Sequence, residues 1–261
     1  MMAVDDPTGA AAESPSETGR GQAAITKRDW VKVWDLPLRM FHWVLVLSIA
    51  VAFLSSEEGS ALHDWHVLSG WVAAILLAFR FVWGFVGGEH SRFSDFIRPA
   101  RVADHVAGLF RGRREAHLGH NPLGAVAVLL LLALTGLTVW TGAFGGEAME
   151  ELHELVAWTL LGLVVLHVAA VILMSIVEKE NLARAMISGD KPAARHPGAV
   201  DAKPPSALGL IVAALVIVGT AVAILQYDPQ AFTRRSAEAF EHRIAARADS
   251  AHEADHEGDE D

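Results

Sequence analysis

The chain contains no cysteine among its 261 residues. The absence of thiols excludes disulfides, iron–sulfur clusters, thiolate zinc sites and haem attached through a CxxCH motif. The 13 histidines are therefore the only strong soft ligands that the sequence offers to a transition metal. Positive charge is also scarce, since 21 Lys and Arg face 31 Asp and Glu and leave a net charge of −10. This balance argues against nucleic acid as a partner.

Hydrophobic residues make up 52% of the chain, which is more than an ordinary soluble domain carries. Five apolar runs approach or exceed the roughly 20 residues that cross a bilayer. They lie at about 36–54, 61–86, 122–141, 150–177 and 206–226. Pro37 suits the first turn of the first run, and Ser206 suits the N-cap of the last. The sequence predicts an all-α integral membrane protein, with a four-helix transmembrane bundle and a fifth C-terminal transmembrane helix.

Polar segments divide the chain into further regions. Residues 1–26 have no apolar signal-peptide core and are expected to form a disordered tail. The four-span domain is expected over 27–192, a linker over 193–205, the fifth span over 206–226 and an acidic tail over 227–261. The loop 88–120 is expected to hold a short helix on the membrane surface and solvated histidines at His90, His105, His117 and His120.

The distribution of Lys and Arg predicts the orientation of the spans. The N-terminal segment, the 88–120 loop and the 178–205 connection carry the positive charge, whereas SSEEGS and GAFGGEAMEE contain no Lys or Arg. The positive-inside rule therefore places the N-terminus in the cytoplasm and the C-terminal tail outside.

The fourth span carries two histidines, His153 and His167, fourteen residues apart. At ~3.6 residues per turn and ~1.5 Å per residue, both leave one helix face about 21 Å apart. Ionisable residues inside a membrane are costly and normally have a partner. The predicted depths pair His153 with His66 of the second span, and His167 with His42 of the first. Each pair could ligate one haem iron, or the histidines could merely join neighbouring helices.

Other intramembrane residues fit the same arrangement. Arg80 follows His66 by fourteen residues and falls at the depth of the inner pair, where it could contact a haem propionate. Its side chain could instead reach water at the membrane interface. Gly70 and Gly162 would leave room beside the histidines for a planar group. The third span has no histidine and no charge, and is expected to serve packing.

Three stretches resemble the bacterial cytochrome b561 family, which includes the b-type membrane subunits of nickel–iron hydrogenases and of formate dehydrogenase. They are VWDLPLRMFHW, HVLSGWVAAILLAFRFVWGFVG and HELVAWTLLGLVVLHVAAVILMSIVEKENLARAMISGDK. The resemblance implies non-covalent b haems, two here, in a multi-pass protein of the bacterial inner membrane. Carried over, the bis-histidine ligands are His42, His66, His153 and His167. His63 competes with His66, but the family's glycine four residues after the ligand, here Gly70, favours His66.

The resemblance also implies a function, which is electron transfer across the membrane between a periplasmic or membrane redox partner and the quinone pool. The partner could be a hydrogenase-like enzyme or a cytochrome c, and the acidic tail 227–261 would suit a basic carrier. Two other functions are a membrane anchor for an enzyme complex and a metal transporter. In the latter, the tail histidines His242, His252 and His256 would collect metal.

Overall fold

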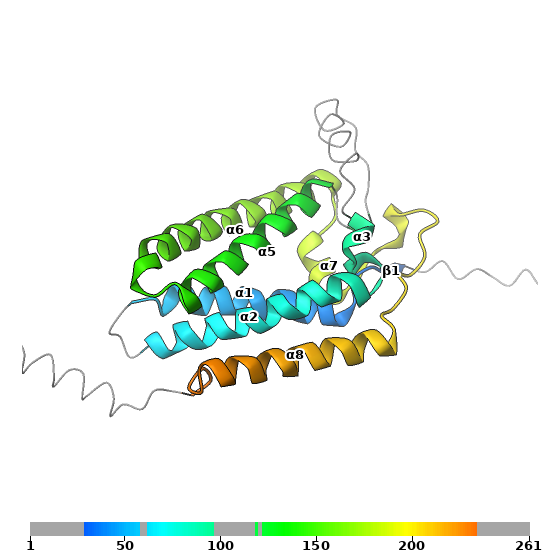
Figure 1. The fold of residues 1–261 in the computed structure, drawn as a ribbon. Helices are drawn as coiled ribbons and strands as arrows, with labels where there is room; N and C mark the ends of the chain where they lie inside the picture. The colour runs from blue at the N-terminus through cyan, green and yellow to red at the C-terminus, as the bar shows by residue number, and fades with distance from the viewer. Residues whose placement is uncertain (1–28, 58–61, 97–117, 120–121, 234–261) are drawn as a thin grey trace, which may run out of the picture.

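The computed structural model describes residues 29–57, 62–96, 118–119 and 122–233 (Figure 1). Its long helices are α1 (Leu36–Leu54), α2 (His63–Val86), α5 (Pro122–Phe144), α6 (Glu150–Glu178) and α8 (Ala207–Tyr227). All five are long and apolar enough to cross a membrane. The prediction of an all-α membrane protein with five spans is confirmed, with helix ends within a few residues of the predicted ranges. The predicted N-terminal tail, residues 234–261 of the predicted acidic tail and the surface helix predicted near 102–110 lie outside the described residues; residues 227–233 of that tail are described.

Short elements gather at one end of the helices, which we call the capped end. There β1 (Trp30–Lys32) pairs antiparallel with β2 (Asp190–Pro192), with Val31 opposite Lys191. The other elements at this end are η1 (Glu89–Ser91), α3 (Phe93–Phe96), α7 (Leu182–Ser188) and η3 (Ala193–Arg195). At the opposite end, the hairpin end, η2 (Glu147–Met149) connects α5 to α6 (Figure 1).

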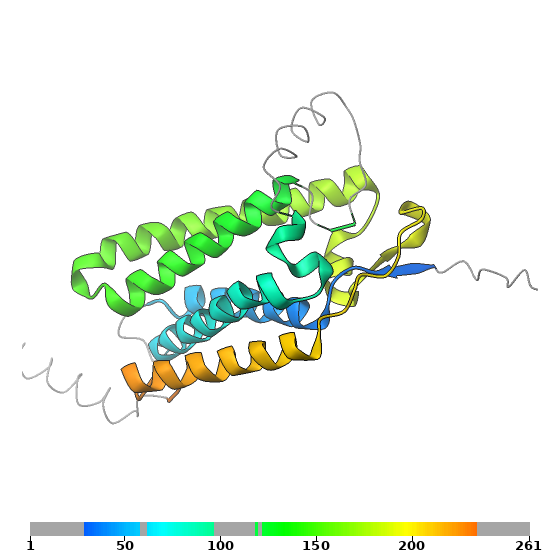
Figure 2. The same ribbon diagram turned by 45° about the vertical axis from the view of Figure 1, so that its right-hand side comes forward.

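The long helices pack as two pairs and a single helix. Helix α1 packs on α2, α5 packs on α6, and the pairs meet through α2 and α5. Helix α8 lies along α2 on the side away from the α5–α6 pair (Figure 2). A buried cluster joins three of these helices and consists of Leu38, Phe41, Phe79, Trp83 and Ala213. Helix α2 is therefore the central element, in contact with α1, α5 and α8.

One carboxylate, that of Asp35, ties the start of α1 to the end of α2. It caps α1 by accepting from the Leu38 backbone N–H at 2.8 Å. It also accepts from Trp83 Nε1 at 3.1 Å, from the Gly88 N–H at 3.1 Å and from Ser91 Oγ. Trp83 is completely buried, so its indole N–H needs such a partner. The depth and rotation of α1 relative to α2 are fixed here.

Helix α7 is held against α1 by hydrogen bonds to its terminal carbonyls. Trp43 Nε1 donates to Met186 O at 3.3 Å, and the Arg39 guanidinium donates to Ile187 O. The last carbonyls of a helix lack intrahelical partners and carry partial negative charge, which suits an arginine. Gly189 then ends α7 with φ of 90°, a conformation that favours glycine. These bonds hold α7 against the start of α1, the end that the charge distribution predicts to face the cytoplasm.

The connection after α6 is fastened by a buried ion cluster. Glu180 lies 3.4 Å from Lys191 Nζ and 3.1 Å from His196 Nε2, and all three side chains are nearly inaccessible to water. Buried charges of this kind are held in place by their partners, so the cluster ties β2 and η3 to the end of α6.

Candidate functional site

Two of the predicted ligands, His66 on α2 and His153 on α6, face each other near the hairpin end. Their ring centroids are 6.0 Å apart and the rings are nearly perpendicular, at 78°. Metal–nitrogen bonds to histidine are about 2 Å long, so two imidazoles on opposite sides of one metal have centres about 6 Å apart. The spacing of this pair therefore suits a six-coordinate iron between the rings.

The backbone fixes which nitrogen of each ring can bind a metal. His66 Nδ1 lies 2.9 Å from Ala52 O, and His153 Nδ1 lies 3.0 Å from Thr138 O. A carbonyl only accepts hydrogen bonds, so each Nδ1 carries the proton and each Nε2 keeps its lone pair. Ala52 O is available because it belongs to the last turn of α1, where carbonyls have no helical partner. Bonds of this type orient histidine ligands in metal sites.

Helix α5 supplies further contacts to His153, although it carries no ligand. Thr141 Oγ1 is 3.2 Å from His153 Nδ1. A Cβ added at Gly142 would lie 2.8 Å from Cε1 of the same ring, so only glycine allows this approach. We call Thr138, Thr141 and Gly142 the α5 cradle. The expectation that this span serves packing alone missed it. The sequence signal was the TVWTG pattern, which puts two threonines and a glycine on neighbouring turns.

The second predicted pair consists of His42 on α1 and His167 on α6. The two side chains are close enough for the charge of one to act on the other. Both are half-buried. Within the described part of the chain, no hydrogen-bond partner reaches the buried Nδ1 of His42. The two residues of the inner pair are thus near each other across the two helix pairs, but no backbone hydrogen bond fixes the tautomer of His42 within the described residues.

His63 and His66 are neighbours on α2, and the structure separates their roles. The His63 ring stacks on His66 with centroids 5.8 Å apart and planes 14° apart. His66 is the one whose ring contacts His153 and whose Nδ1 is bound to Ala52 O. This geometry favours His66 as the ligand, in agreement with the glycine four residues later.

The two glycines predicted to make room beside the histidines border open space. A Cβ added at Gly70 or at Gly162 would meet no atom within 4 Å. Gly70 is one turn from His66, so the space beside it borders the facing rings and fits a planar group held between the two helix pairs. Gly162 is exposed and, nine residues after His153, lies about half a turn around α6 from it, so its open space is on another face of the helix.

Arg80 lies inside the bundle. Its residue is 2% exposed, and its guanidinium carbon lies 4.7 Å from the centroid of the Phe93 ring. Asp35 is near enough to attract its charge. The alternative that Arg80 reaches interfacial water is wrong, because Phe93 of α3 covers the guanidinium. Its contact with a propionate stays a prediction.

His90 is not solvated, contrary to the expectation for the 88–120 loop. Its side chain is 15% exposed, and its Nδ1 lies 2.9 Å from Asp95 Oδ2. Its ring also meets Trp34 at a centroid distance of 6.4 Å. The reason is that η1 and α3 fold back on the capped end. The sequence predicted a polar loop there and did not indicate this packing. His105, His117 and His120 lie outside the described residues.

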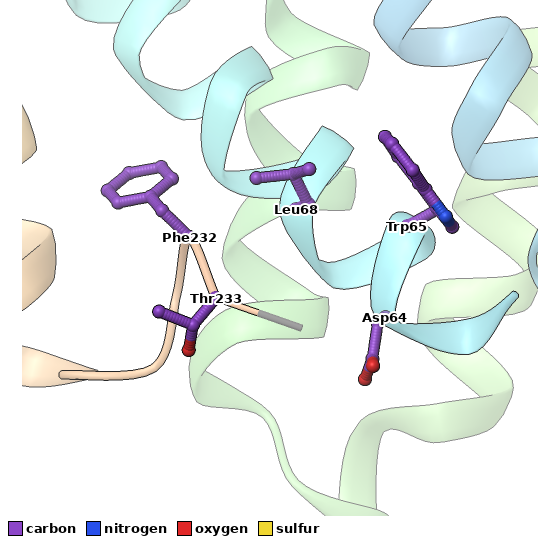
Figure 3. Close-up of a pocket in the computed structure, with 5 residues that line it drawn as sticks. All are labelled: Asp64, Trp65, Leu68, Phe232 and Thr233. Atoms are coloured by element: carbon purple, nitrogen blue, oxygen red, sulfur yellow. The ribbon is translucent and has the colours of Figure 1, made fainter. Parts of the chain in front are cut away.

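A small surface pocket lies at the hairpin end, away from the facing histidines. It is lined by Asp64, Trp65 and Leu68 of α2 and by Phe232 and Thr233, which follow α8 (Figure 3). The described residues contain no group of three or more His, Cys, Asp or Glu able to hold a bare metal ion. The tail histidines that suggested metal collection lie beyond these residues.

Five spans with facing intramembrane histidines define an integral membrane protein arranged to hold a planar metal cofactor. The family model of the prokaryotic cytochrome b561 matches residues 33–189. The chain belongs to this family. It is a multi-pass membrane b-type cytochrome, which holds haem b and takes part in electron transfer.

The relatives are named as hydrogenase subunits. A probable Ni/Fe-hydrogenase B-type cytochrome subunit of Azotobacter vinelandii is 27% identical over 230 residues, covering 69% of this chain and 95% of the relative. The same-named protein of Rhizobium leguminosarum is 24% identical, with 69% and 95% covered. The hydrogenase 1 subunit of Escherichia coli K12 is 25% identical, with 60% and 88% covered. No solved structure matches the chain.

Proposed function

We propose that the chain is a di-haem cytochrome, with His66 and His153 as ligands of an outer haem and His42 and His167 as ligands of an inner haem. The observation that carries the proposal is the outer pair, whose rings are 6.0 Å apart and whose Nδ1 atoms are both bound to backbone carbonyls. Two polar residues that merely joined helices would need neither this spacing nor two rings that both bind a carbonyl through Nδ1.

Haem iron supplies one-electron chemistry, because it is stable in both the ferrous and the ferric state. The histidines would hold the iron through Nε2 from both sides, which excludes water and oxygen as ligands. The bonds from Nδ1 to Ala52 O and Thr138 O make the imidazoles more basic and keep their planes in place. These residues therefore give a site suited to electron transfer rather than to binding a substrate at the metal.

Arg80 is proposed as a partner of the inner haem. A buried guanidinium is stabilised by an anion, and a haem propionate supplies one of the right charge and shape. Asp35, at the start of α1, already attracts Arg80 and would hold it at this depth. The positive charge would favour the reduced iron, so the inner site would accept electrons readily.

We propose that the capped end faces the cytoplasm and the hairpin end faces the periplasm of a bacterial inner membrane. The support is the excess of Lys and Arg in the segments that leave the capped end. A quinone would exchange electrons near the inner haem, reaching it from the lipid. The flank of α1 beside His42 is open to a lipid-soluble molecule, since Met40 is 56% exposed and Trp43 is 42% exposed.

The redox partner at the hairpin end is proposed to be a hydrogenase-like enzyme, because the curated relatives carry that name. The outer haem would lie nearest to that partner and would pass electrons to the inner haem and then to the quinone. A soluble cytochrome c could take the same place, guided by the acidic tail.

The test is a haem determination on the purified full chain. A pyridine haemochrome assay should give about two b haems per chain, and acid–acetone should extract all of the haem. Electron paramagnetic resonance should show low-spin ferric signals typical of two imidazole ligands. One haem at full occupancy would contradict the di-haem proposal, and a colourless protein would favour a membrane anchor. His90 lies outside the spans, so His90→Ala is a matched control for alanine substitutions of the four proposed ligands. It should keep the full haem content.

A further inference from the structure

Helix α8 lies beyond the stretch that matches the family, which ends at residue 189. It packs closely on α2 near the capped end, where a Cβ added at Gly209 would lie 2.6 Å from Val86 O. Ser206 caps it by accepting from the Gly209 N–H at 3.0 Å, as predicted. Its opposite face is open to lipid, with Leu208 68% and Leu215 66% exposed. The four-span core contains all four proposed haem ligands, so the role of α8 is not explained by ligation.

The last residues of α8 touch both helix pairs at the hairpin end. Trp71 of α2, only 8% exposed, donates from Nε1 to Asp228 Oδ2 at 3.2 Å. The Tyr227 hydroxyl donates to Ala143 O of α5 at 3.2 Å. The Tyr227 ring also lies 5.1 Å from the Phe144 ring and 6.0 Å from the Trp71 ring. We call Tyr227 and Asp228 the C-terminal clamp, because they bind α2 and α5 at once.

The chain after the clamp is folded rather than extended. The Ala231 N–H donates to Asp228 O at 3.0 Å, and Ala231 is 2% exposed. Phe232 packs on the buried cluster around Trp71 and lines the pocket with Leu68 (Figure 3). This turn holds Asp228 in place against α2, so the clamp is a built contact and not a chance approach of a chain end.

The clamp grips the two helices next to the outer ligands. Ala143 follows Gly142 of the α5 cradle, which holds His153 in place. Trp71 follows Gly70, one turn after His66. The two ligands belong to different helix pairs, so their separation depends on how closely α2 and α5 are held at this end.

We infer that the C-terminal clamp is a positioning device for the outer haem, which sets the separation of the helices that present His66 and His153. This inference rests on the proposed function. A fifth helix that served only as an additional membrane anchor would affect neither haem selectively. The clamp would act on the outer site and leave the inner pair, at the opposite end of the bundle, unchanged.

The test compares two full-length variants that each remove hydrogen bonds of α8, at opposite ends. Tyr227→Phe combined with Asp228→Ala breaks the clamp, and Ser206→Ala removes the cap at the other end. Haem release to excess apomyoglobin and redox titration are measured for each haem, which is assigned beforehand with His153→Ala and His167→Ala. The clamp variant should release the outer haem roughly tenfold faster and shift its potential, while the inner haem keeps both values. Ser206→Ala should leave the outer haem unchanged.

A second measurement does not depend on haem. Because the chain has no cysteine, spin labels can be attached at Leu62→Cys, the N-cap of α2, and at Trp140→Cys on α5, both exposed. The distance distribution between the labels should broaden when the clamp is broken. If the double variant does not accumulate, Trp71→Phe can replace it. This substitution keeps an aromatic ring but removes the N–H, and it should give a smaller change in the same direction.

The two proposals fail in different ways. Unchanged outer haem and an unchanged label distance in the clamp variants would overturn the clamp while leaving the di-haem proposal intact. An equal effect on both haems, or an equal effect of Ser206→Ala, would also overturn it. A wild-type protein without haem would overturn the proposed function and this role of the clamp with it.

Discussion

At the scale of single residues, the proposed outer site depends on which ring nitrogen of each histidine carries the proton. His66 and His153 each donate a hydrogen bond from Nδ1 to a backbone carbonyl, which leaves the lone pair of Nε2 for a metal. The proposed inner ligands differ, since the His42 ring lies against Trp43, at a centroid distance of 5.0 Å, and no hydrogen bond from the described residues reaches its Nδ1. We therefore expect the two haems to differ in potential and in their response to substitution.

The pairing of ligands is tested by single alanine variants. His153→Ala and His66→Ala should abolish the same component of the absorption and resonance spectra, because both remove a ligand of one iron. His42→Ala and His167→Ala should abolish the other. If His153→Ala and His167→Ala remove the same component, the pairing is wrong. His63→Ala should preserve both components, and loss of the outer one would make His63 the ligand.

Substitution of Arg80 should change the potential of one haem. A unit charge roughly 8 Å from the iron acts with about 2 kcal/mol at an effective dielectric constant near 20, or on the order of 90 mV for one electron. Arg80→Leu should lower the midpoint potential of the inner haem by an amount of this order, because the positive charge favours ferrous iron. Arg80→Lys keeps the positive charge, so the midpoint potential of the inner haem should stay close to its wild-type value. A normal haem content with an unchanged potential would place the propionate elsewhere.

At the scale of elements, the proposed outer ligands are held in place by helices other than their own. Helix α5 contributes the cradle for His153, the end of α1 contributes Ala52 O for His66, and Asp35 sets α1 against α2. Each contact uses a carbonyl, hydroxyl or carboxylate at a helix end or a glycine that allows close approach. The site is therefore a property of the bundle and not of α6 alone.

Gly142→Ala should damage the outer site without unfolding the protein. The added Cβ would lie 2.8 Å from the His153 ring, which must move away from Thr138 O. Alanine is favoured over glycine in a helix by about 1 kcal/mol, so α5 itself should not be weakened. The outer haem should lose its low-spin spectrum while the inner haem keeps it. The control is Gly136→Ala, whose Cβ would only touch Leu77 at 4.0 Å, and equal damage there would contradict the cradle.

Asp35→Ala should lower stability more than an ordinary polar substitution. It leaves the indole N–H of the fully buried Trp83 without its carboxylate partner and removes the N-cap of α1. A lost hydrogen bond to a charged group together with a lost cap costs about 3 kcal/mol. Thermal unfolding in detergent should show a clear drop in midpoint. Asp95→Ala, which removes the carboxylate bonded to His90, is the control and should cost less.

At the scale of the whole molecule, two surfaces meet different surroundings. The long helices expose apolar side chains such as Leu155 at 64% and Ile176 at 68%, which lipid would cover. The ends carry the charge, and the net charge of −10 is supplied largely by the two terminal segments. The proposed orientation would direct the acidic C-terminal segment toward a periplasmic partner.

Removal of the acidic tail tests whether it docks a partner. The deletion should begin after Thr233, because Asp228 and Ala231 belong to the fold. If the tail attracts a basic c-type cytochrome, the deletion should slow electron transfer at low salt and reduce its dependence on salt. Stopped-flow oxidation at two ionic strengths measures both. The same rate and the same salt dependence with and without residues 234–261 would remove the tail from docking.

The sequence by itself determined the five spans, and it predicted which of their connections carry positive charge and which histidines share a depth. These follow from local properties, since apolar length, capping residues such as Ser206 and the 3.6-residue period act within one helix. The family match also rests on residues that can be read along the chain. The sequence did not specify where the fifth helix packs, because an apolar helix carries no local signal for the helix that it will contact.

Only the tertiary structure decided the contacts between helices. It placed His66 rather than His63 against His153 and covered Arg80 with Phe93. It also gave α5 its role around His153 and joined Tyr227 and Asp228 to α5 and α2. The physical reason is that hydrogen bonds and close approaches act over a few ångströms between segments far apart in the chain. Their partners are therefore set by packing, which a single sequence does not contain.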